Sequence, residues 1–168
     1  MNLKSLATAS ALAVFWMPTA AHAQHADHSA HGTQTTAPDA LTQEATAVLV
    51  AYREALVARD EAAMRALFRA DSLVFENGKA EGSFAQYMEH HLGPELGEIT
   101  EFTFSNPTVN VRMAGHVALG HETYRYRIAL TDGRVIERDG VATSVLTHED
   151  GVWKIVQYHS SSRAPRPN

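Results

Sequence analysis

Four residues of the sequence, Tyr52, Glu76, His91 and His159, carry side chains that can donate or accept a proton inside a pocket. A carboxylate in apolar surroundings has a raised pKa and can act as a base or an acid. An imidazole changes its charge near neutral pH and can relay a proton or bind an anion. If the fold brings these groups to one cavity, they could transfer a proton next to a carbonyl group.

Helical periodicity places two of these side chains on apolar faces. Tyr52 recurs on one helical stripe with Val48 and Leu56, and His91 shares the apolar face of a later helix with Phe84. Both are therefore expected to point inward. A pocket would satisfy the tyrosine hydroxyl and the imidazole, but a single buried hydrogen bond within an ordinary core would satisfy them equally well.

Strand alternation is less decisive for the other two. Glu76 shares a face with Val74, and alternation alone does not say whether this face is the inner one or leaves Glu76 at the rim. In the last strand, alternation predicts one shared face for Trp153, Ile155, Gln157, His159 and Ser161. That face changes from apolar to polar, as expected of a strand that reaches the mouth of a cavity. The predicted ligand-binding residues are accordingly His91, Tyr124, Gln157 and Trp153.

Helices are expected in the first half of the domain, each after a capping residue. The first begins after Asp39 or Thr42 and ends near Arg59, the second spans Glu61 to Arg69 after Asp60, and the third spans Phe84 to Leu92 after Ser83. The dipeptide Gly93-Pro94 is expected to stop the third helix.

Strands dominate the second half. A short strand, Ser72 to Glu76, ends at the turn dipeptide Asn77-Gly78. Long alternating strands are then expected over Ile99 to Met113, His116 to Leu130, Arg134 to His148 and Val152 to Ser161. Asn106-Pro107 indicates a bulge or an edge position in the first of them. Helices followed by an antiparallel meander are typical of the α+β class.

Two stretches carry a resemblance to a known superfamily. They are AYREALVARDEAAMRALFRADSLVFENG, which begins at Ala51, and HEDGVWKIVQYHSSSRAP, which begins at His148. The first resembles the opening of ketosteroid isomerase-like proteins, and the second resembles the end of the association domain of calcium/calmodulin-dependent kinase II. Over residues 40–164, the order of elements resembles the SnoaL-like, or nuclear transport factor 2-like, superfamily. The resemblance implies a cystatin-like cone, with three N-terminal helices packed on a curved antiparallel sheet around an open pocket.

The resemblance also implies roles for single residues. Tyr52 falls on the oxyanion tyrosine of the isomerases and Glu76 on their general base, so a catalytic site would use Glu76 as base and Tyr52 and His159 as donors to the oxyanion. Two positions depart from the family patterns. The isomerases carry a second acid where this sequence has Thr143, and the kinase domain carries an arginine where this sequence has Ser144. Whether the protein is an enzyme therefore stays open.

Three functions remain as alternatives. The first is a small-molecule ligand bound in the cone, with isomerase-like or dehydratase-like proton transfer if there is catalysis. The second is a dimeric or oligomeric assembly module without catalysis, because the family usually dimerises through the exposed face of its sheet. The third is metal handling in the cell envelope. Fold alone does not choose among these alternatives.

The N-terminal segment reads as a targeting signal. Lys4 precedes an apolar run, Pro18 breaks it, and Ala21-His22-Ala23 matches a cleavage pattern. The run is short for a membrane span. We therefore expect a signal peptide over residues 1–23, a periplasmic or secreted protein, and no membrane attachment after cleavage.

A His-rich tether, residues 24–38, is expected between the signal peptide and the domain, which spans 39–164 and ends in a tail at 165–168. The tether carries His25, His28 and His31. Neutral imidazoles suit copper or zinc, so weak metal binding is one interpretation of this segment. A solvated linker whose histidines bind nothing is the other. No other cofactor is expected.

Composition limits the remaining possibilities. The chain has 168 residues, enough for one domain of ordinary size, and a formal net charge of −5. A negative chain lacks the basic footprint that non-specific nucleic-acid binding requires, so no nucleic-acid partner is expected. The absence of cysteine excludes disulfides, thiolate metal sites and cysteine nucleophiles.

Overall fold

The computed structural model describes residues 39–166. The predicted signal peptide and tether, including His25, His28 and His31, lie outside these described residues. Within them, no helix combines the length and the apolar character that a membrane span requires.

Two capped helices open the domain. Helix α1 spans Ala40–Ala58, and the side chain of Asp39 accepts a hydrogen bond from the backbone N–H of Thr42 at its start. Helix α2 spans Glu61–Leu67 and begins at Asp60, which caps it in the same way. Both N-terminal caps agree with the prediction. Helix α2 ends two residues before the predicted Arg69, because the chain is already extended at Phe68.

The third helical region is longer than predicted. It consists of α3 (Phe84–Tyr87), the π-helical segment η1 (Met88–Leu92) and α4 (Gly93–Glu98). The prediction that Gly93-Pro94 ends the helix is wrong. Gly93 has helical backbone angles and donates its N–H to the carbonyl of Met88, which belongs to the π pattern. Pro94 then falls in the first turn of α4, where a missing N–H costs little.

A six-stranded sheet forms the rest of the domain, in the order β2-β1-β6-β5-β4-β3. The strands are β1 (Phe68–Glu76), β2 (Lys79–Gly82), β3 (Ile99–Ala114), β4 (Val117–Leu130), β5 (Val135–Glu149) and β6 (Val152–Arg163). All neighbours are antiparallel except β1 and β6, which run parallel. The short strand β2 was not expected from the sequence.

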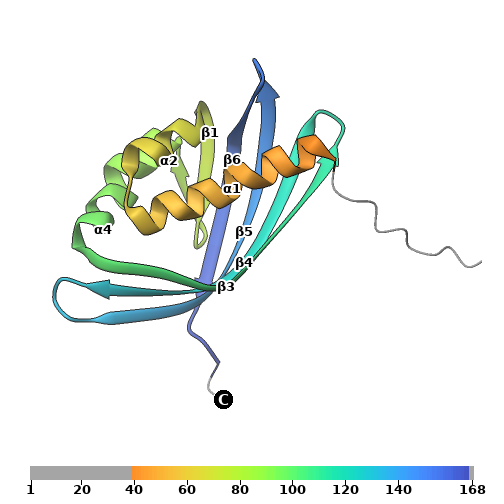
Figure 1. The fold of residues 1–168 in the computed structure, drawn as a ribbon. Helices are drawn as coiled ribbons and strands as arrows, with labels where there is room; N and C mark the ends of the chain where they lie inside the picture. The colour runs from red at the N-terminus through yellow and green to blue at the C-terminus, as the bar shows by residue number, and fades with distance from the viewer. Residues whose placement is uncertain (1–38, 167–168) are drawn as a thin grey trace, which may run out of the picture. The chain divides into compact units, whose positions relative to one another are not determined.

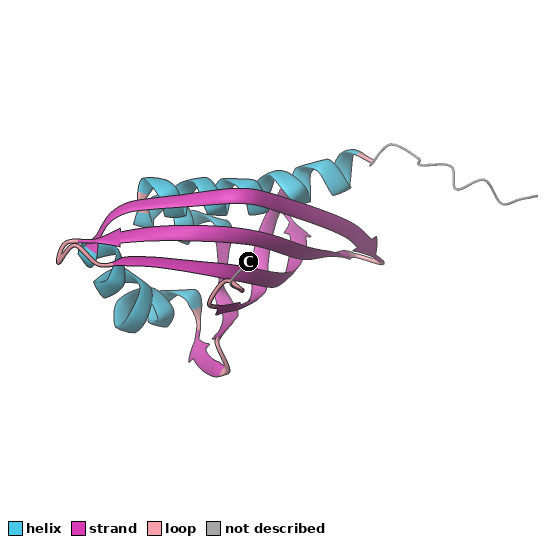
Figure 2. Cartoon of the chain, turned by 90° about the horizontal axis from the view of Figure 1, so that it is seen from below, coloured by secondary structure: helices cyan, strands magenta, loops and turns pink. Residues whose placement is uncertain are grey.

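Helix α1 lies across one face of the sheet, here called the inner face (Figure 1). In the described part of the chain, the opposite outer face carries no helix (Figure 2). The core between α1 and the inner face includes Leu49 of α1, Leu146 of β5 and Ile155 of β6, all with no exposed surface. The predicted α+β fold, with helices packed on a curved sheet, is confirmed.

Besides a register shift at the start of β3, between Ile99 and Glu101, two bulges interrupt the alternation of the long strands. The β3 bulge falls at Asn106, which has a φ of 52°, in agreement with the sequence. The second bulge was not predicted: in β6, Ile155 pairs with Leu146 but Gln157 pairs with Val145, so one extra residue lies between the two pairs. An extra residue reverses the alternation of every residue after it.

The bulge in β6 overturns part of the predicted face. Trp153 and Ile155 point to the inner face, and after the bulge Tyr158 does so as well. Gln157 and His159 consequently lie on the outer face and are exposed. The prediction that these two residues share a face with Trp153 is wrong for this reason.

Candidate functional site

A cavity of about 100 Å³ lies between α1, β1 and the inner face of β3 and β4. It is called the inner cavity below. It is lined by Tyr52, Arg53, Leu56, Glu76, Tyr87, Leu92, Glu95, Ile99, Phe102, Phe104, Glu122, Tyr124, Tyr126, Ile128, Tyr158 and Ser160. A wider depression of about 780 Å³, called the mouth, shares Glu76, Glu95, Ile99, Tyr126 and Ile128 with it. The inner cavity therefore borders an open approach from one side.

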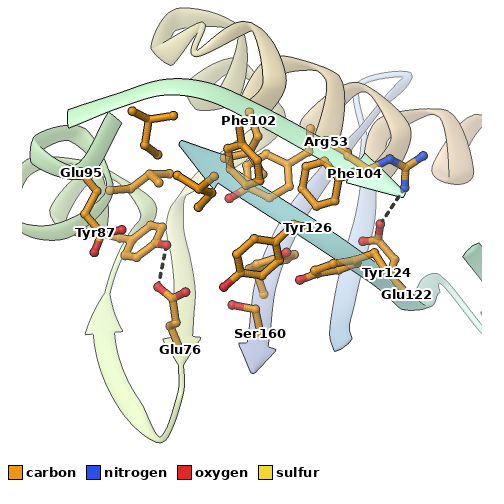
Figure 3. Close-up of a pocket in the computed structure, with 16 residues that line it drawn as sticks. Arg53, Glu76, Tyr87, Glu95, Phe102, Phe104, Glu122, Tyr124, Tyr126 and Ser160 are labelled. Carbon is orange, nitrogen blue, oxygen red and sulfur yellow. Dashed lines mark hydrogen bonds and ion pairs between the residues drawn. The ribbon is translucent and has the colours of Figure 1, made fainter. Parts of the chain in front are cut away.

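Aromatic rings make up much of the cavity wall (Figure 3). Phe102 and Phe104 of β3 stack with their ring centres 4.9 Å apart. Tyr124 of β4 meets Phe104 edge to face at 5.2 Å. Gly140 on β5 leaves room for this tyrosine, because a Cβ atom there would overlap the Tyr124 ring. Such a wall favours flat, largely apolar molecules.

Three tyrosine hydroxyls bring polarity to this wall. Tyr52 of α1 and Tyr158 of β6 are 3% and 7% exposed, and their rings meet at 5.1 Å. Burial raises the pKa of both hydroxyls, and of Tyr124 on β4, above the ordinary value for tyrosine. All three hydroxyls therefore keep their protons at physiological pH. Those of Tyr124 and Tyr158 hydrogen-bond to each other, and tyrosine hydroxyls can also donate hydrogen bonds to a ligand.

Glu122 is a buried carboxylate that was not among the predicted site residues. It lies on the inner face of β4 with its side chain 4% exposed, and its Oε2 is 3.3 Å from Nη1 of Arg53 on α1 (Figure 3). Burial raises the pKa of Glu122 to about 7, although the charge of Arg53 acts in the opposite direction. The alternation that puts Tyr124, Tyr126 and Ile128 on one face also includes Glu122, so a signal for it was present in the sequence.

Glu76 lies on the inner face of β1, as the family resemblance implied. Its Oε2 accepts a hydrogen bond of 2.7 Å from the hydroxyl of Tyr87 on α3 (Figure 3). The Glu76 side chain is 23% exposed and lines both the inner cavity and the mouth. It is thus reachable by a ligand from either space.

His91 belongs to the mouth and contacts three carboxylates. Its Nδ1 is 3.0 Å from Oε1 of Glu81 and 3.8 Å from Oε2 of Glu76, and its Nε2 is 3.2 Å from Oε1 of Glu95. Burial by itself lowers the pKa of His91, but the hydrogen bond to Glu81 and the charges of Glu95 and Glu76 outweigh it, so the pKa is raised. The imidazole is 27% exposed, in keeping with its predicted place on the apolar face.

The structure gathers only some of the predicted site residues. Tyr52, Glu76 and Tyr124 line the inner cavity, and His91 lines the mouth. Trp153 is 5% exposed in the core, with its ring 5.0 Å from that of His148, and lines neither space. His159 is on the outer face, where its ring meets that of Phe75 at 6.5 Å.

Within residues 39–166, no three histidine, aspartate or glutamate side chains gather in an arrangement that could hold a metal ion. The predicted copper or zinc ligands, His25, His28 and His31, lie outside the described residues. Metal binding by the tether stays a prediction.

The chain belongs to the SnoaL-like domain family, whose family model matches residues 45–165. This confirms the resemblance that was inferred from the two sequence stretches. No curated protein matches the chain at a significant level.

Solved structures with the same fold agree with this family assignment. A candidate ketosteroid isomerase from Shewanella frigidimarina is 26% identical, with a TM-score of 0.62, over 71% of this chain and 97% of that one. A nuclear transport factor 2-like superfamily protein from Salmonella enterica is 19% identical, with a TM-score of 0.67, over 76% and 94%. A protein with a cystatin-like fold from Caulobacter vibrioides is 21% identical, with a TM-score of 0.63, over 74% and 90%.

Proposed function

We propose that the domain binds a small, largely apolar molecule that carries a carbonyl group, and that it transfers a proton next to that carbonyl. The observation that carries this proposal is an aromatic cavity whose wall contains three carboxylates, Glu76, Glu95 and Glu122, and buried tyrosine hydroxyls. Apolar pockets with a few convergent polar groups are the usual form of small-molecule sites. The likeness to a candidate ketosteroid isomerase supports the same class of reaction.

The proposed step has a base and two donors. Glu76 removes a proton from the carbon beside the carbonyl, and the electron pair moves to the carbonyl oxygen. The Tyr52 hydroxyl and the protonated form of Glu122 donate hydrogen bonds to this oxyanion. Return of the proton from Glu76 to another carbon completes an isomerisation. Glu122 on β4 would supply the second acid that the isomerases carry where this sequence has Thr143.

Proton exchange tests this proposal without knowledge of the natural substrate. The protein is incubated in D₂O with small cyclic ketones such as 2-cyclohexenone, and loss of the α-proton signals is followed by NMR. Wild-type protein is expected to accelerate the exchange, and Glu76→Gln is expected to slow it by about a hundredfold or more. Glu137→Gln, which changes an exposed carboxylate on β5, is the matched control. Exchange at the wild-type rate in Glu76→Gln would refute the role of Glu76 as base.

We propose further that the outer face of the sheet forms a homodimer. Leu73 of β1 and Val141 of β5 lie on this face with 49% and 51% of their surface exposed, and a second copy of the sheet would bury them. Light scattering after size exclusion is expected to give a dimer for the wild type and a monomer for Val141→Glu. Val57→Glu, on exposed surface of α1, is expected to stay dimeric. A monomeric wild type would refute this proposal.

For the N-terminal segment, we propose cleavage after Ala23 and a periplasmic or secreted location. N-terminal sequencing of the mature protein tests this, and an intact Met1 would contradict it.

If the tether handles copper or zinc, deletion of residues 24–38 should abolish the calorimetric metal isotherm and leave ligand binding in the cavity unchanged. Metal binding that persists after the deletion would show that the tether does not hold the metal.

A further inference from the structure

Arg138 has an unusual position for an arginine. It lies on the inner face of β5, directly opposite Tyr126 of β4, and its side chain is half-buried in the wall of the mouth. The other arginines of β4 and β5 point to the outer face, where Arg125 pairs with Asp139 and Arg127 pairs with Glu101. Among residues 39–166, the guanidinium of Arg138 makes no side-chain hydrogen bond and no ion pair, although its charge acts on the neighbouring hydroxyl of Tyr126.

The acids of the mouth all have partners of their own. Glu76 accepts the hydroxyl of Tyr87, and Glu95 lies 3.2 Å from His91. Glu98 accepts a hydrogen bond of 2.9 Å from the hydroxyl of Thr131.

The second arginine of the mouth is also paired, since Arg134 lies 2.6 Å from Asp132. In the described part of the chain, Arg138 is therefore the charged group of the mouth that is left without a partner. A half-buried guanidinium has lost part of its hydration, so an anion that replaces the lost water is stabilised there.

The surroundings of Arg138 complete a place for an oxyanion. The hydroxyl of Tyr126 lies 3.1 Å from that of Ser162, and both residues line the mouth with Arg138. Hydroxyl groups and a planar guanidinium fork match the two oxygens of a carboxylate. His91 contacts three carboxylates, Glu76, Glu81 and Glu95, whose charges oppose the binding of an anion. The protonated imidazole cancels one of these three charges, and its raised pKa extends the pH range in which it does so.

The mouth and the inner cavity share Tyr126 and Ile128, so one ligand can occupy both. We propose that the ligand class is an aromatic or alicyclic carboxylic acid, whose ring enters the inner cavity and whose carboxylate binds Arg138 in the mouth. This inference rests on the proposed small-molecule function and adds to it the charge of the ligand and its orientation. It predicts that binding depends on Arg138, a residue that takes no part in the proposed proton transfer.

Matched pairs of ligands test the inference. Phenylacetate and 3-phenylpropionate are titrated into the purified protein by calorimetry, each beside its neutral amide. The better of the two acids is expected to bind at least about tenfold more tightly than its amide, as a charge-assisted hydrogen bond allows. Arg138→Gln is expected to remove this preference and to leave the affinity for the amide unchanged, which also shows that the variant is folded.

Two further variants sharpen the test. Arg127→Gln removes an arginine from the outer face of the neighbouring strand and is expected to keep the full preference for acids. Arg138→Lys keeps the charge but loses the fork, and an intermediate preference is expected. If the amides bind and the acids bind no more tightly, the inference is wrong and the proposed cavity function stands. An acid preference that persists in Arg138→Gln also overturns it. If neither acids nor amides bind, the proposed function itself fails.

Discussion

The carboxylate of Glu122 and the guanidinium of Arg53 face each other between β4 and α1, with 3.3 Å between Oε2 and Nη1. The pair does not lock Glu122 in its charged form, because burial raises its pKa to about 7. Near neutral pH this carboxyl group is thus divided between a form that can donate a proton and one that can accept it. A group poised in this way suits acid and base catalysis in the cavity that it lines.

The same shift links stability to pH. The ordinary pKa of the side chain is 4.5 and the folded value is about 7, so between these values the folded state holds a proton that the unfolded chain has released. Stability therefore falls as pH rises through this window, by on the order of 3 kcal/mol in total. In Glu122→Gln this part of the fall should be absent, as measured by urea unfolding at pH 5 and pH 8.

Other groups also titrate between pH 5 and pH 8, and comparison of the wild type with Glu122→Gln separates their effect on stability from that of Glu122. His91 also has a raised pKa, so its stabilisation is likewise lost as pH rises, but this loss is common to the wild type and Glu122→Gln. Glu137→Gln should keep the wild-type pH dependence. A Glu122→Gln protein that loses as much stability as the wild type between pH 5 and pH 8 would contradict the buried environment described for Glu122.

Gly140 makes room for the ring of Tyr124, so a methyl group at this position should disturb the cavity wall. Gly140→Ala is expected to lower the free energy of unfolding by about 1–3 kcal/mol, as overpacking of a core does, and to weaken binding of cyclic ligands. Gly97→Ala is the matched control, because a Cβ atom on Gly97 of α4 has open space. Equal stability of the two variants in urea unfolding would be evidence against this packing.

The hydrogen bond from Tyr87 to Glu76 joins the helical region to the strand that carries the proposed base. Tyr87→Phe removes the hydroxyl and leaves a partly buried carboxylate without this donor, so the free energy of unfolding should fall by about 1–2 kcal/mol. The α-proton exchange rate should change as well, since the orientation of Glu76 is less restricted. Unchanged stability together with unchanged exchange would show that this contact does not hold Glu76 in place.

The outer position of His159 leads to a direct comparison with Tyr52. His159→Ala should leave both ligand binding and α-proton exchange at wild-type levels, because this imidazole lies on the face of the sheet away from the cavity. Tyr52→Phe removes a donor inside the cavity and should slow the exchange by about tenfold or more. If His159→Ala slowed the exchange more than Tyr52→Phe did, His159 would belong to the site and its assignment to the outer face of β6 would be wrong.

Much of the fold could be predicted from local patterns. The capping residues Asp39, Asp60 and Ser83 predict where their helices begin, because each cap is a contact within one turn of the chain. The bulge at Asn106 is also a local event, signalled by the proline that follows it. The continuation of the helical region through Gly93 could not be predicted, because it depends on the switch of hydrogen-bonding pattern in η1.

The site was harder to predict than the fold. Alternation brings Glu76 to the inner face because β1 is regular at its end, and it could have found Glu122 in the same way. It fails for His159, because nothing in the residues of β6 marks the bulge that reverses the faces after Ile155. The unpaired state of Arg138 could not be predicted either, because it depends on which acids of the mouth already have other partners. Such contacts join distant parts of the chain, so a local sequence pattern does not predict them.

Ligand binding in the inner cavity is tested most directly by an NMR titration of the ¹⁵N-labelled protein with 2-cyclohexenone, followed through the assigned amide signals. Saturable shifts are expected at residues around the inner cavity, with Tyr52, Glu122 and Tyr124 among them, and unchanged signals at Val141 and His159 on the outer face. Tyr52→Phe and Gly140→Ala should weaken the titration. Shifts confined to the outer face, or no saturable shift for any small ketone or ring acid, would contradict the assignment of the aromatic cavity as a ligand site.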